Sequence, residues 1–419
     1  MDLSTHTLPN GLTVASVRLP GFRTAAIAVF VRAGSRNEPA RLNGLAHFLE
    51  HMAFKGTASR DARAIAIAIE RVGAQMNAYT AKDHTAYHTV LLSEHTDVAL
   101  EVLADVLRRS IFPPEEIERE RGVILQELAD AADDPEGVAQ DEFDLRAFPR
   151  QAFGRPILGS PRAVRAVSRD DCIAYQQTHY TACNMVVVGV GGIEHSPFLD
   201  QVARHFGDLP RGAPVPADPV RYVGGYRHVD DDYEQTSIAL GWPIPARTDP
   251  NYPVFEMLGD LLGGGMSSPL FQSVREQRGL AYAVDAYAEG HEDCGTLLVT
   301  AGVAPRNLRL FFDVACEQIA ALTDRIEPED LERARNQYRT HLARRLERPL
   351  ALAESIARDL FLHGRVVPID ETLYRSQQID DAALRAAATE MLRAKPTLVL
   401  VGRAGRGDHH EAVRRRLAR

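Results

Sequence analysis

Two histidines four residues apart, with a glutamate between them, are the residues of this sequence best suited to chemistry. His47, Glu50 and His51 form the pattern H-x-x-E-H inside a segment, 45–52, whose apolar residues recur at helical spacing. Because positions i and i+4 of a helix lie on the same face, both imidazoles can be directed at one metal ion, with Glu50 beside them. Two neutral imidazole ligands and a carboxylate acting as general base are the parts of a zinc-dependent hydrolytic site. The alternative is a helix face with two hydrogen-bonded histidines and a surface glutamate.

A catalytic zinc site needs a third protein ligand, and the segment 113–128 offers two candidate glutamates. Prolines at its start and acidic residues in the turn that follows predict the N-terminus of a helix. Glu120 and Glu127 are seven residues apart, so they lie two turns apart on one face of that helix. One can bind the metal while the other orients a ligand, and the spacing does not say which. Taken alone, this acidic helix is more simply a solvated charged face.

Composition and charge narrow the class of protein. The chain has 419 residues, 45% hydrophobic and 25% charged, which is typical of a soluble globular protein of two to four domains. It contains no apolar run of 18 residues and no hydrophobic segment at its start, so we expect no membrane span, no secretory signal and a cytoplasmic location. The net charge of −9 argues against general nucleic-acid binding. The four cysteines, which form no C-x-x-C pair, are expected to be buried thiols.

A segment rich in proline and glycine, 207–222, divides the chain into two halves of similar pattern. We predict one domain at 1–206, this linker, and a second, homologous domain at 223–419. The order of elements in each half predicts an α+β fold: two similar α/β-sandwich domains, each with a mostly antiparallel sheet covered by helices. The predicted strands cover 11–17, 24–31, 87–92, 184–189, 236–241, 295–302 and 397–402, and the predicted helices cover 43–53, 97–110, 196–206, 252–262 and 307–323.

The sequence resembles the pitrilysin/insulinase-type zinc peptidases, which are inverzincins because of their H-x-x-E-H order. It is most similar to the short-chain branch that includes the subunits of mitochondrial processing peptidase. The resemblance begins at residues 8–14, continues through 33–38 and 44–57, and covers nearly the whole chain. In this family the third ligand follows the second histidine by about 76 residues, in a helix like the one around 120–127.

The resemblance implies a role for each residue of the metal pattern. His47, His51 and Glu127 would bind one zinc ion per chain, and Glu50 would be the general base that takes a proton from the attacking water. Glu120 matches the upstream glutamate of the family and would support the site by orienting a ligand. The first domain would therefore be the zinc-binding catalytic domain.

The resemblance also implies a substrate-binding strand. Asn77, Ala78, Tyr79 and Thr80 match the family's edge strand, to which a peptide adds as an extra strand through backbone hydrogen bonds. The family usually continues with the pattern T-x-x-E-x-T-x-Y. Here Asp83 replaces the glutamate of that pattern, which leaves the role of the position open.

The second half carries its own family signature. Three glycines, 263–265, precede a helical segment, but no G-K-[ST] follows them, so phosphate binding is only weakly indicated. The resemblance implies that Arg275 and Tyr282, further along, are catalytic donors to a substrate carbonyl or a developing oxyanion. Family relatives often have arginine where this chain has Pro269. The second domain would therefore carry the Arg/Tyr pair.

The implied activity is that of a zinc endopeptidase or oligopeptidase that hydrolyses unfolded peptides inside an enclosed chamber. In two-chain members of the family, one subunit carries the zinc motif and its partner the Arg/Tyr pair, whereas this chain has both. We therefore expect a homodimer in which Arg275 and Tyr282 of one chain complete the zinc site of the other. A heterodimer with an inactive sibling chain is the alternative, and the alternative function is a non-catalytic or partner-dependent subunit of a heteromeric processing peptidase. We expect peptides as partners, and neither nucleic acid nor membranes.

Overall fold

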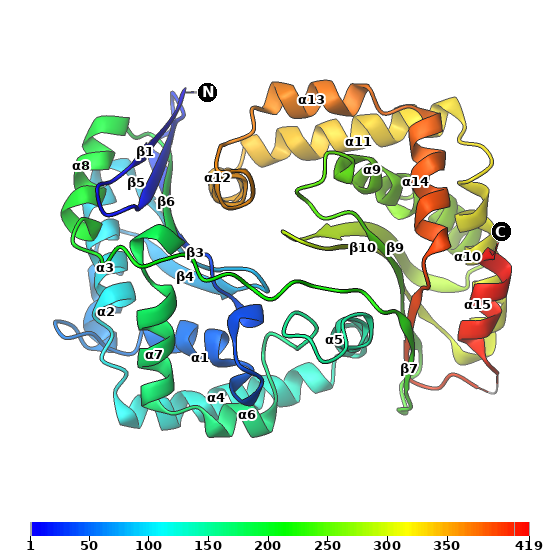
Figure 1. The fold of residues 1–419 in the computed structure, drawn as a ribbon, viewed down its shortest axis with the longest axis horizontal. Helices are drawn as coiled ribbons and strands as arrows, with labels where there is room; N and C mark the ends of the chain where they lie inside the picture. The colour runs from blue at the N-terminus through cyan, green and yellow to red at the C-terminus, as the bar shows by residue number, and fades with distance from the viewer. Residues whose placement is uncertain (1, 406, 419) are drawn as a thin grey trace. The chain divides into compact units, whose positions relative to one another are not determined.

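Two compact units make up the chain in the computed structural model, which describes residues 2–405 and 407–418 (Figure 1). The domains predicted at 1–206 and 223–419 are contiguous, whereas each unit also takes in one segment from the other half of the chain. The chain passes from the first unit to the second after Asp218, inside the segment predicted as the linker. The first unit comprises Met1–Ala129, Arg155–Asp218 and Arg344–Val366, and the second comprises Asp130–Gly154, Pro219–Ala343 and Val367–Arg419.

A six-stranded sheet is the centre of the first unit. Its strands are β1 (Asp2–Thr7), β2 (Thr13–Arg18), β3 (Thr24–Val31), β4 (Gln75–Thr80), β5 (Thr85–Leu92) and β6 (Met185–Gly191). They lie in the order β1-β2-β6-β3-β5-β4, and only β2 and β6 pair in parallel. Because β3 is central and buried on both faces, its sequence is a nearly continuous apolar run. Strand β4 lies at one edge of the sheet.

The second unit contains a five-stranded sheet with the same topology. Its strands are β7 (Gly225–Val229), β8 (Thr236–Ile244), β9 (Ala281–Gly290), β10 (Gly295–Val303) and β11 (Thr397–Val401). The order β7-β11-β8-β10-β9 repeats the order β2-β6-β3-β5-β4, with one parallel pair, β7 and β11, in the corresponding place. The prediction of two similar sandwich domains with mostly antiparallel sheets is thereby confirmed.

Helices cover the sheets in both units (Figure 1). No helix in the described part of the chain is long and apolar enough to cross a membrane. The first half of the chain contains α1 (Leu45–Ala53), α2 (Ala62–Glu70), α3 (Thr96–Arg108), α4 (Pro114–Ala132), α5 (Pro135–Ala147), α6 (Pro161–Ala166), α7 (Arg169–His179) and α8 (His195–Phe206). The second half contains α9 (Tyr252–Gly263), α10 (Leu308–Ala321), α11 (Pro328–Leu346), α12 (Pro349–His363), α13 (Ile369–Gln377), α14 (Asp381–Arg393) and α15 (His409–Leu417).

The two halves exchange one helix each, at the same place in the repeat. Helix α5, which follows α4, packs against β11, β8 and β7 of the second unit, and α12, which follows α11, packs against β6 and β3 of the first. Phe143 of α5 is fully buried there, and a Cβ atom at Gly241 of β8 would lie only 2.8 Å from its ring. Leu352 and Ile356 of α12 are buried in the same way on the first sheet. Each sheet thus obtains the cover of one face from the other half of the sequence.

Removal of the Phe143 ring tests the contribution of the exchanged helix α5. Because the ring is fully buried, we expect Phe143→Ala to lower the free energy of unfolding of the second unit by about 3–5 kcal/mol. Trp242, the only tryptophan of the chain, is buried in β8 and reports on this unit through its fluorescence during urea denaturation. Leu145→Ala on the same helix, at a side chain 38% exposed, is the matched control and should cost less than about 1 kcal/mol. Equal losses in the two variants would contradict this role of Phe143.

Candidate metal centre

Helix α1 turns its apolar side into the core of the first unit and its polar side toward α4. Its apolar residues are spaced three and four apart, as a one-sided helix requires. His47, Glu50 and His51 lie on the other side and are only partly exposed. The buried residues of the helix are Leu45, Ala46, Phe48, Leu49, Met52 and Ala53.

A buried glutamate from the preceding loop caps α1. Oε1 of Glu38 accepts a hydrogen bond from the backbone N–H of Ala46 at 2.7 Å, and Oε2 accepts one from the N–H of Gly44 at 2.8 Å and one from Asn43 Nδ2 at 3.1 Å. Gly44 has a φ of 99°, a left-handed conformation that favours glycine. The carboxylate thus satisfies two backbone donors that the first turn of a helix leaves free. Sequence reasoning missed Glu38, because a cap is normally sought directly before the helix.

Burial raises the pKa of Glu38 to about 7, although the hydrogen bonds from Ala46, Asn43 and Gly44 act in the opposite direction. The position of α1, and with it the histidines, is therefore tied to a carboxyl group that changes its charge near neutral pH.

Three potential ligand atoms converge between α1 and α4. The Nε2 atoms of His47 and His51 are 3.2 Å apart. Oε2 of Glu127 lies 3.8 Å from His47 Nε2 and 3.6 Å from His51 Nε2. Among the described residues, these three form the one group of histidine, cysteine or acidic side chains close enough to hold a metal ion.

The arrangement of these atoms fits a zinc ion. Ligand atoms bound tetrahedrally at about 2.0–2.1 Å from zinc are about 3.3 Å apart, close to the separations found here. Burial, with a smaller effect of His51, lowers the pKa of His47 to about 4, so this imidazole is neutral at pH 7, as a metal ligand must be. Two neutral imidazoles and a carboxylate are a donor set that zinc accepts.

Glu120 lies behind His51, on the side away from the other ligands. Its Oε2 is 3.1 Å from Nδ1 of His51, and only 5% of its side chain is exposed. The structure therefore separates the two glutamates that spacing left equivalent: Glu127 meets both histidines, and Glu120 meets the far nitrogen of one. A carboxylate in that second position orients an imidazole ligand.

Glu50 links the metal group to the edge strand β4. Its Oε2 accepts a 2.6 Å hydrogen bond from the hydroxyl of Thr80, the last residue of the strand. Burial raises the pKa of Glu50, while the Thr80 hydrogen bond and His51 lower it and Glu127 raises it further, with a net shift upward. Residues 77–80, predicted to bind substrate, all lie on β4, whose only strand neighbour in the described sheet is β5.

Asp83, the residue that departs from the family pattern, forms an ion pair with Arg36. Their side chains approach to 2.7 Å, and Arg36 is almost completely buried. This contact joins the turn between β4 and β5 to the loop before α1. The shorter acid therefore has a partner in the structure, on the segment that leads to Glu38.

Arg275 and Tyr282 lie together in the second unit. The guanidinium carbon of Arg275 is 4.7 Å from the centre of the Tyr282 ring and also 4.7 Å from that of Phe271. Tyr282 is 77% exposed, at the start of the edge strand β9. The glycine loop before them is tied to α11 by a 2.7 Å hydrogen bond from Gln337 Nε2 to the carbonyl oxygen of Gly264.

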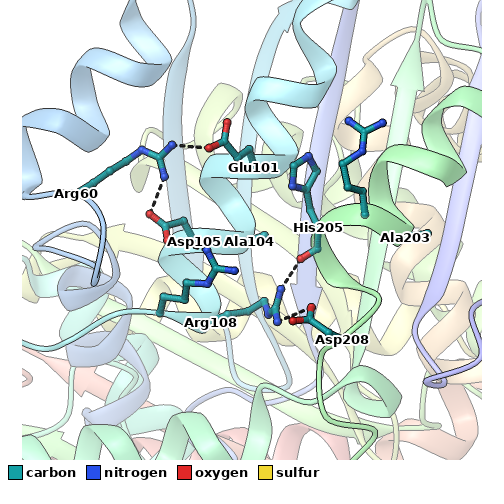
Figure 2. Close-up of a pocket in the computed structure, with 10 residues that line it drawn as sticks. Arg60, Glu101, Ala104, Asp105, Arg108, Ala203, His205 and Asp208 are labelled. Carbon is teal, nitrogen blue, oxygen red and sulfur yellow. Dashed lines mark hydrogen bonds and ion pairs between the residues drawn. The ribbon is translucent and has the colours of Figure 1, made fainter.

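A pocket on the first unit lies apart from the metal group, between α3, α8 and the loop before α2 (Figure 2). It has a volume of about 270 Å³. Arg60 pairs with Glu101 at 2.6 Å and with Asp105 at 2.8 Å, and Arg108 pairs with Asp208 at 2.6 Å. These charges largely neutralise one another, so the pocket indicates an ion-pair network that joins helices and gives no sign of a ligand.

Comparison with known proteins shows the family to which the chain is similar. Residues 13–161 match the family model described as insulinase (peptidase family M16), and residues 166–338 match the model described as peptidase M16 inactive domain. An uncharacterized zinc protease of Rickettsia bellii is 34% identical over 94% of this chain and 96% of its own length. An uncharacterized zinc protease of Streptomyces coelicolor is 35% identical over 94% of this chain and 88% of its own.

Two further comparisons extend the likeness. A probable mitochondrial-processing peptidase subunit beta of Arabidopsis thaliana is 33% identical over 93% of this chain and 76% of its own. A solved protease structure from Helicobacter pylori superposes with a TM-score of 0.89 at 22% identity, over 96% of this chain and 99% of that one. This structural likeness concerns the fold.

The Glu38 cap predicts a pH dependence of stability. Because the pKa of Glu38 is raised from 4.5 to about 7 in the folded chain, its stabilising contribution is complete below about pH 4.5 and is lost as the pH rises through 7. Relative to Glu38→Gln, the wild-type chain should lose up to about 1.4 kcal/mol of unfolding free energy per pH unit across this range. Urea denaturation of the metal-free protein between pH 4.5 and 8 measures the difference. Glu115→Gln, at an exposed glutamate of α4, is the control. Parallel stability curves for wild type and Glu38→Gln would refute the linkage.

Proposed function

Because the chain belongs to peptidase family M16, the insulinase family, we propose that it is a zinc-dependent peptidase that hydrolyses peptide bonds of unfolded peptides. The observation that carries the proposal is the convergence of His47, His51 and Glu127, with Glu50 beside them and hydrogen-bonded to the edge strand β4. One helix thus supplies two ligands and a base, and the strand next to the base lies at an edge of the described sheet, where a substrate strand can be added.

In this proposal, His47, His51 and Glu127 hold the zinc ion, which when bound acts as a Lewis acid that polarises the scissile carbonyl and makes water more acidic. Glu50 takes the proton of the attacking water and can return it to the leaving amine. The Thr80 hydroxyl donates to Oε2 of Glu50, which leaves Oε1 for the water. The upward shift in the pKa of Glu50 brings the base closer to the pH at which it works.

We propose that the substrate lies as an extended strand along β4. Strand β4 pairs only with β5 in the described sheet, so its outer edge can accept a strand by β-augmentation once the Asn77 side chain releases the N–H of Ala78, which donates to Asn77 Oδ1 at 2.9 Å. A folded protein cannot offer such a strand without local unfolding, so the geometry selects for unfolded peptides. Backbone pairing reads little of the side-chain sequence, which favours broad specificity within an enclosed chamber.

Arg275 and Tyr282 are proposed to donate hydrogen bonds to the substrate carbonyl or to the oxyanion that develops from it. The guanidinium of Arg275 lies over the ring of Tyr282, and the exposed Tyr282 is accessible to a ligand. We propose a homodimer in which the pair of one chain completes the metal group of the other. The second candidate is a subunit of a heteromeric processing peptidase, favoured by the 33% identity to a probable mitochondrial-processing peptidase subunit beta.

Glu50→Gln separates metal binding from turnover. Because Glu50 lies outside the group of three ligand atoms, we expect the variant to keep its zinc, while removal of the base lowers the rate of peptide cleavage at least about 100-fold. Metal content by mass spectrometry and digestion of a mixed peptide pool, with and without a chelator, measure the two effects. Glu127→Gln is the comparison variant and should lose both zinc and activity. Loss of zinc from Glu50→Gln would contradict the assignment of its role, and zinc-loaded wild type that cleaves no peptide would overturn the proposed activity.

Mixing two inactive variants tests the shared site. In a mixed dimer of Glu50→Gln and Arg275→Ala chains, one of the two sites combines an intact Glu50 with an intact Arg275 from the other chain. Random exchange of subunits should therefore restore about a quarter of the wild-type activity. Absence of any recovery, in dimers shown by native mass spectrometry to be mixed, would rule out completion of the site by a second chain.

A further inference from the structure

Lys55 lies directly behind the carboxylate that contacts His51. Its Nζ atom is 2.5 Å from Oε1 of Glu120, and Oε2 of the same carboxylate is 3.1 Å from Nδ1 of His51. One buried carboxylate therefore bridges an ammonium group and an imidazole, with a separate oxygen for each. Neither the pattern of metal ligands nor the choice between the two glutamates of α4 involves this lysine.

We propose that Lys55 is a positioning residue for the metal: through Glu120 it holds His51 in the tautomer that carries its proton on Nδ1 and leaves the lone pair of Nε2 free for zinc. This inference rests on the proposed role of His51 as a ligand, and it does not depend on peptide hydrolysis.

The two histidines differ in the hydrogen-bond partner of their Nδ1 atoms. Nδ1 of His47 is buried and has no hydrogen-bond partner in the described part of the chain, whereas Nδ1 of His51 has Glu120. No described residue fixes the tautomer of His47 through this atom, so among the described residues the contact between Lys55, Glu120 and His51 is the one that orients a candidate ligand before metal binds. Since ligand preorganisation of this kind commonly changes metal affinity 10–100-fold, the effect is large enough to measure.

The surroundings make the contact effective. Glu120 is only 5% exposed, so its interactions with Lys55 and His51 are screened little by water and salt. An unpaired carboxylate buried to this extent would be costly, and the ammonium group supplies the partner. With Oε1 held by Lys55, rotation of the carboxylate away from His51 would break two contacts at once.

Lys55 itself is held by an anchored backbone. Helix α1 ends at Ala53, and the N–H of Lys55 still donates to the carbonyl oxygen of Met52 at 3.2 Å. Two residues later, the hydroxyl of Thr57 donates a 2.8 Å hydrogen bond to Oδ2 of the buried Asp105 on α3. The backbone is therefore held on both sides of Lys55, and this fixes the position from which its side chain reaches Glu120.

Zinc affinity of the full chain is the direct test. The metal-free protein is titrated with zinc in competition with a chromophoric chelator at one fixed pH. Lys55→Met, which keeps most of the side-chain stem without the charge, should bind zinc about 10–100-fold more weakly. Lys55→Arg retains a cationic donor and should recover most of the wild-type affinity. Lys395→Met, at an exposed lysine of the second unit, is the matched control and should bind like the wild type.

A double-mutant cycle distinguishes action through Glu120 from a general loss of structure. If Lys55 acts through this carboxylate, Lys55→Met should weaken zinc binding by less than about threefold when Glu120→Gln is already present. The same 10–100-fold loss in both backgrounds would overturn the proposal, and so would a Lys55→Met chain with wild-type affinity.

The tautomer of His51 can be measured directly, and it would not change if Lys55 only stabilised the fold. In metal-free protein labelled with 15N-histidine, the signals of His51, identified by their absence in His51→Ala, should show the proton on Nδ1 in the wild type. Lys55→Met should shift this population toward Nε2, and an unchanged population would count against the proposal. Wild-type zinc binding without peptide cleavage would refute the proposed function alone, whereas an unaltered Lys55→Met in an active enzyme would refute this inference alone.

Discussion

Helices α1 and α4 have to be held at one separation, because the candidate metal group takes its side chains from both. His47 and His51 come from α1 and Glu127 comes from α4, with 3.2–3.8 Å between their ligand atoms. The histidine pair follows from helix geometry, but the position of Glu127 beside it depends on a long-range contact, so any relative shift of the helices separates the three side chains. The contact between Lys55, Glu120 and His51 joins the two helices, and the cap on α1 holds its start. The same contacts therefore serve stability and chemistry.

The second unit has the same topology as the first, but different side chains at the place that corresponds to the candidate metal group. In the second unit, α9 follows the central strand as α1 does, and its Glu256 and Asp260 are four residues apart. His341 of α11 lies 3.7 Å from Asp260, while Glu256 contacts Arg247 at 3.4 Å. The corresponding place is thus occupied by acids and bases that pair with one another, and no metal-binding group occurs among the described residues of that unit. The topology thus occurs twice, whereas the candidate metal group occurs in one copy only among the described residues.

The exchange of α5 and α12 makes the two halves of the sequence interdependent. Each sheet is covered on one face by helices of its own half and on the other by a helix from the opposite half. A boundary drawn at the proline-rich segment separates two halves with a similar order of elements, but it does not separate two independent cores. The central strands β3 and β8 are buried on both faces only because this exchange takes place.

Local spacing was enough for the sequence to determine the His47–Glu50–His51 face, the order of strands and helices along each half and the class of fold, because these depend on helix and strand periods. The order of the strands within each sheet came from the tertiary structure. Resemblance to a known family, and not spacing, distinguished Glu127 from Glu120. Tertiary structure alone decided that Glu38 caps α1, that Lys55 stands behind Glu120, and that the halves exchange helices. The physical reason is that each of these contacts joins residues brought together by loops and packing, whose geometry no periodic pattern in a single sequence records.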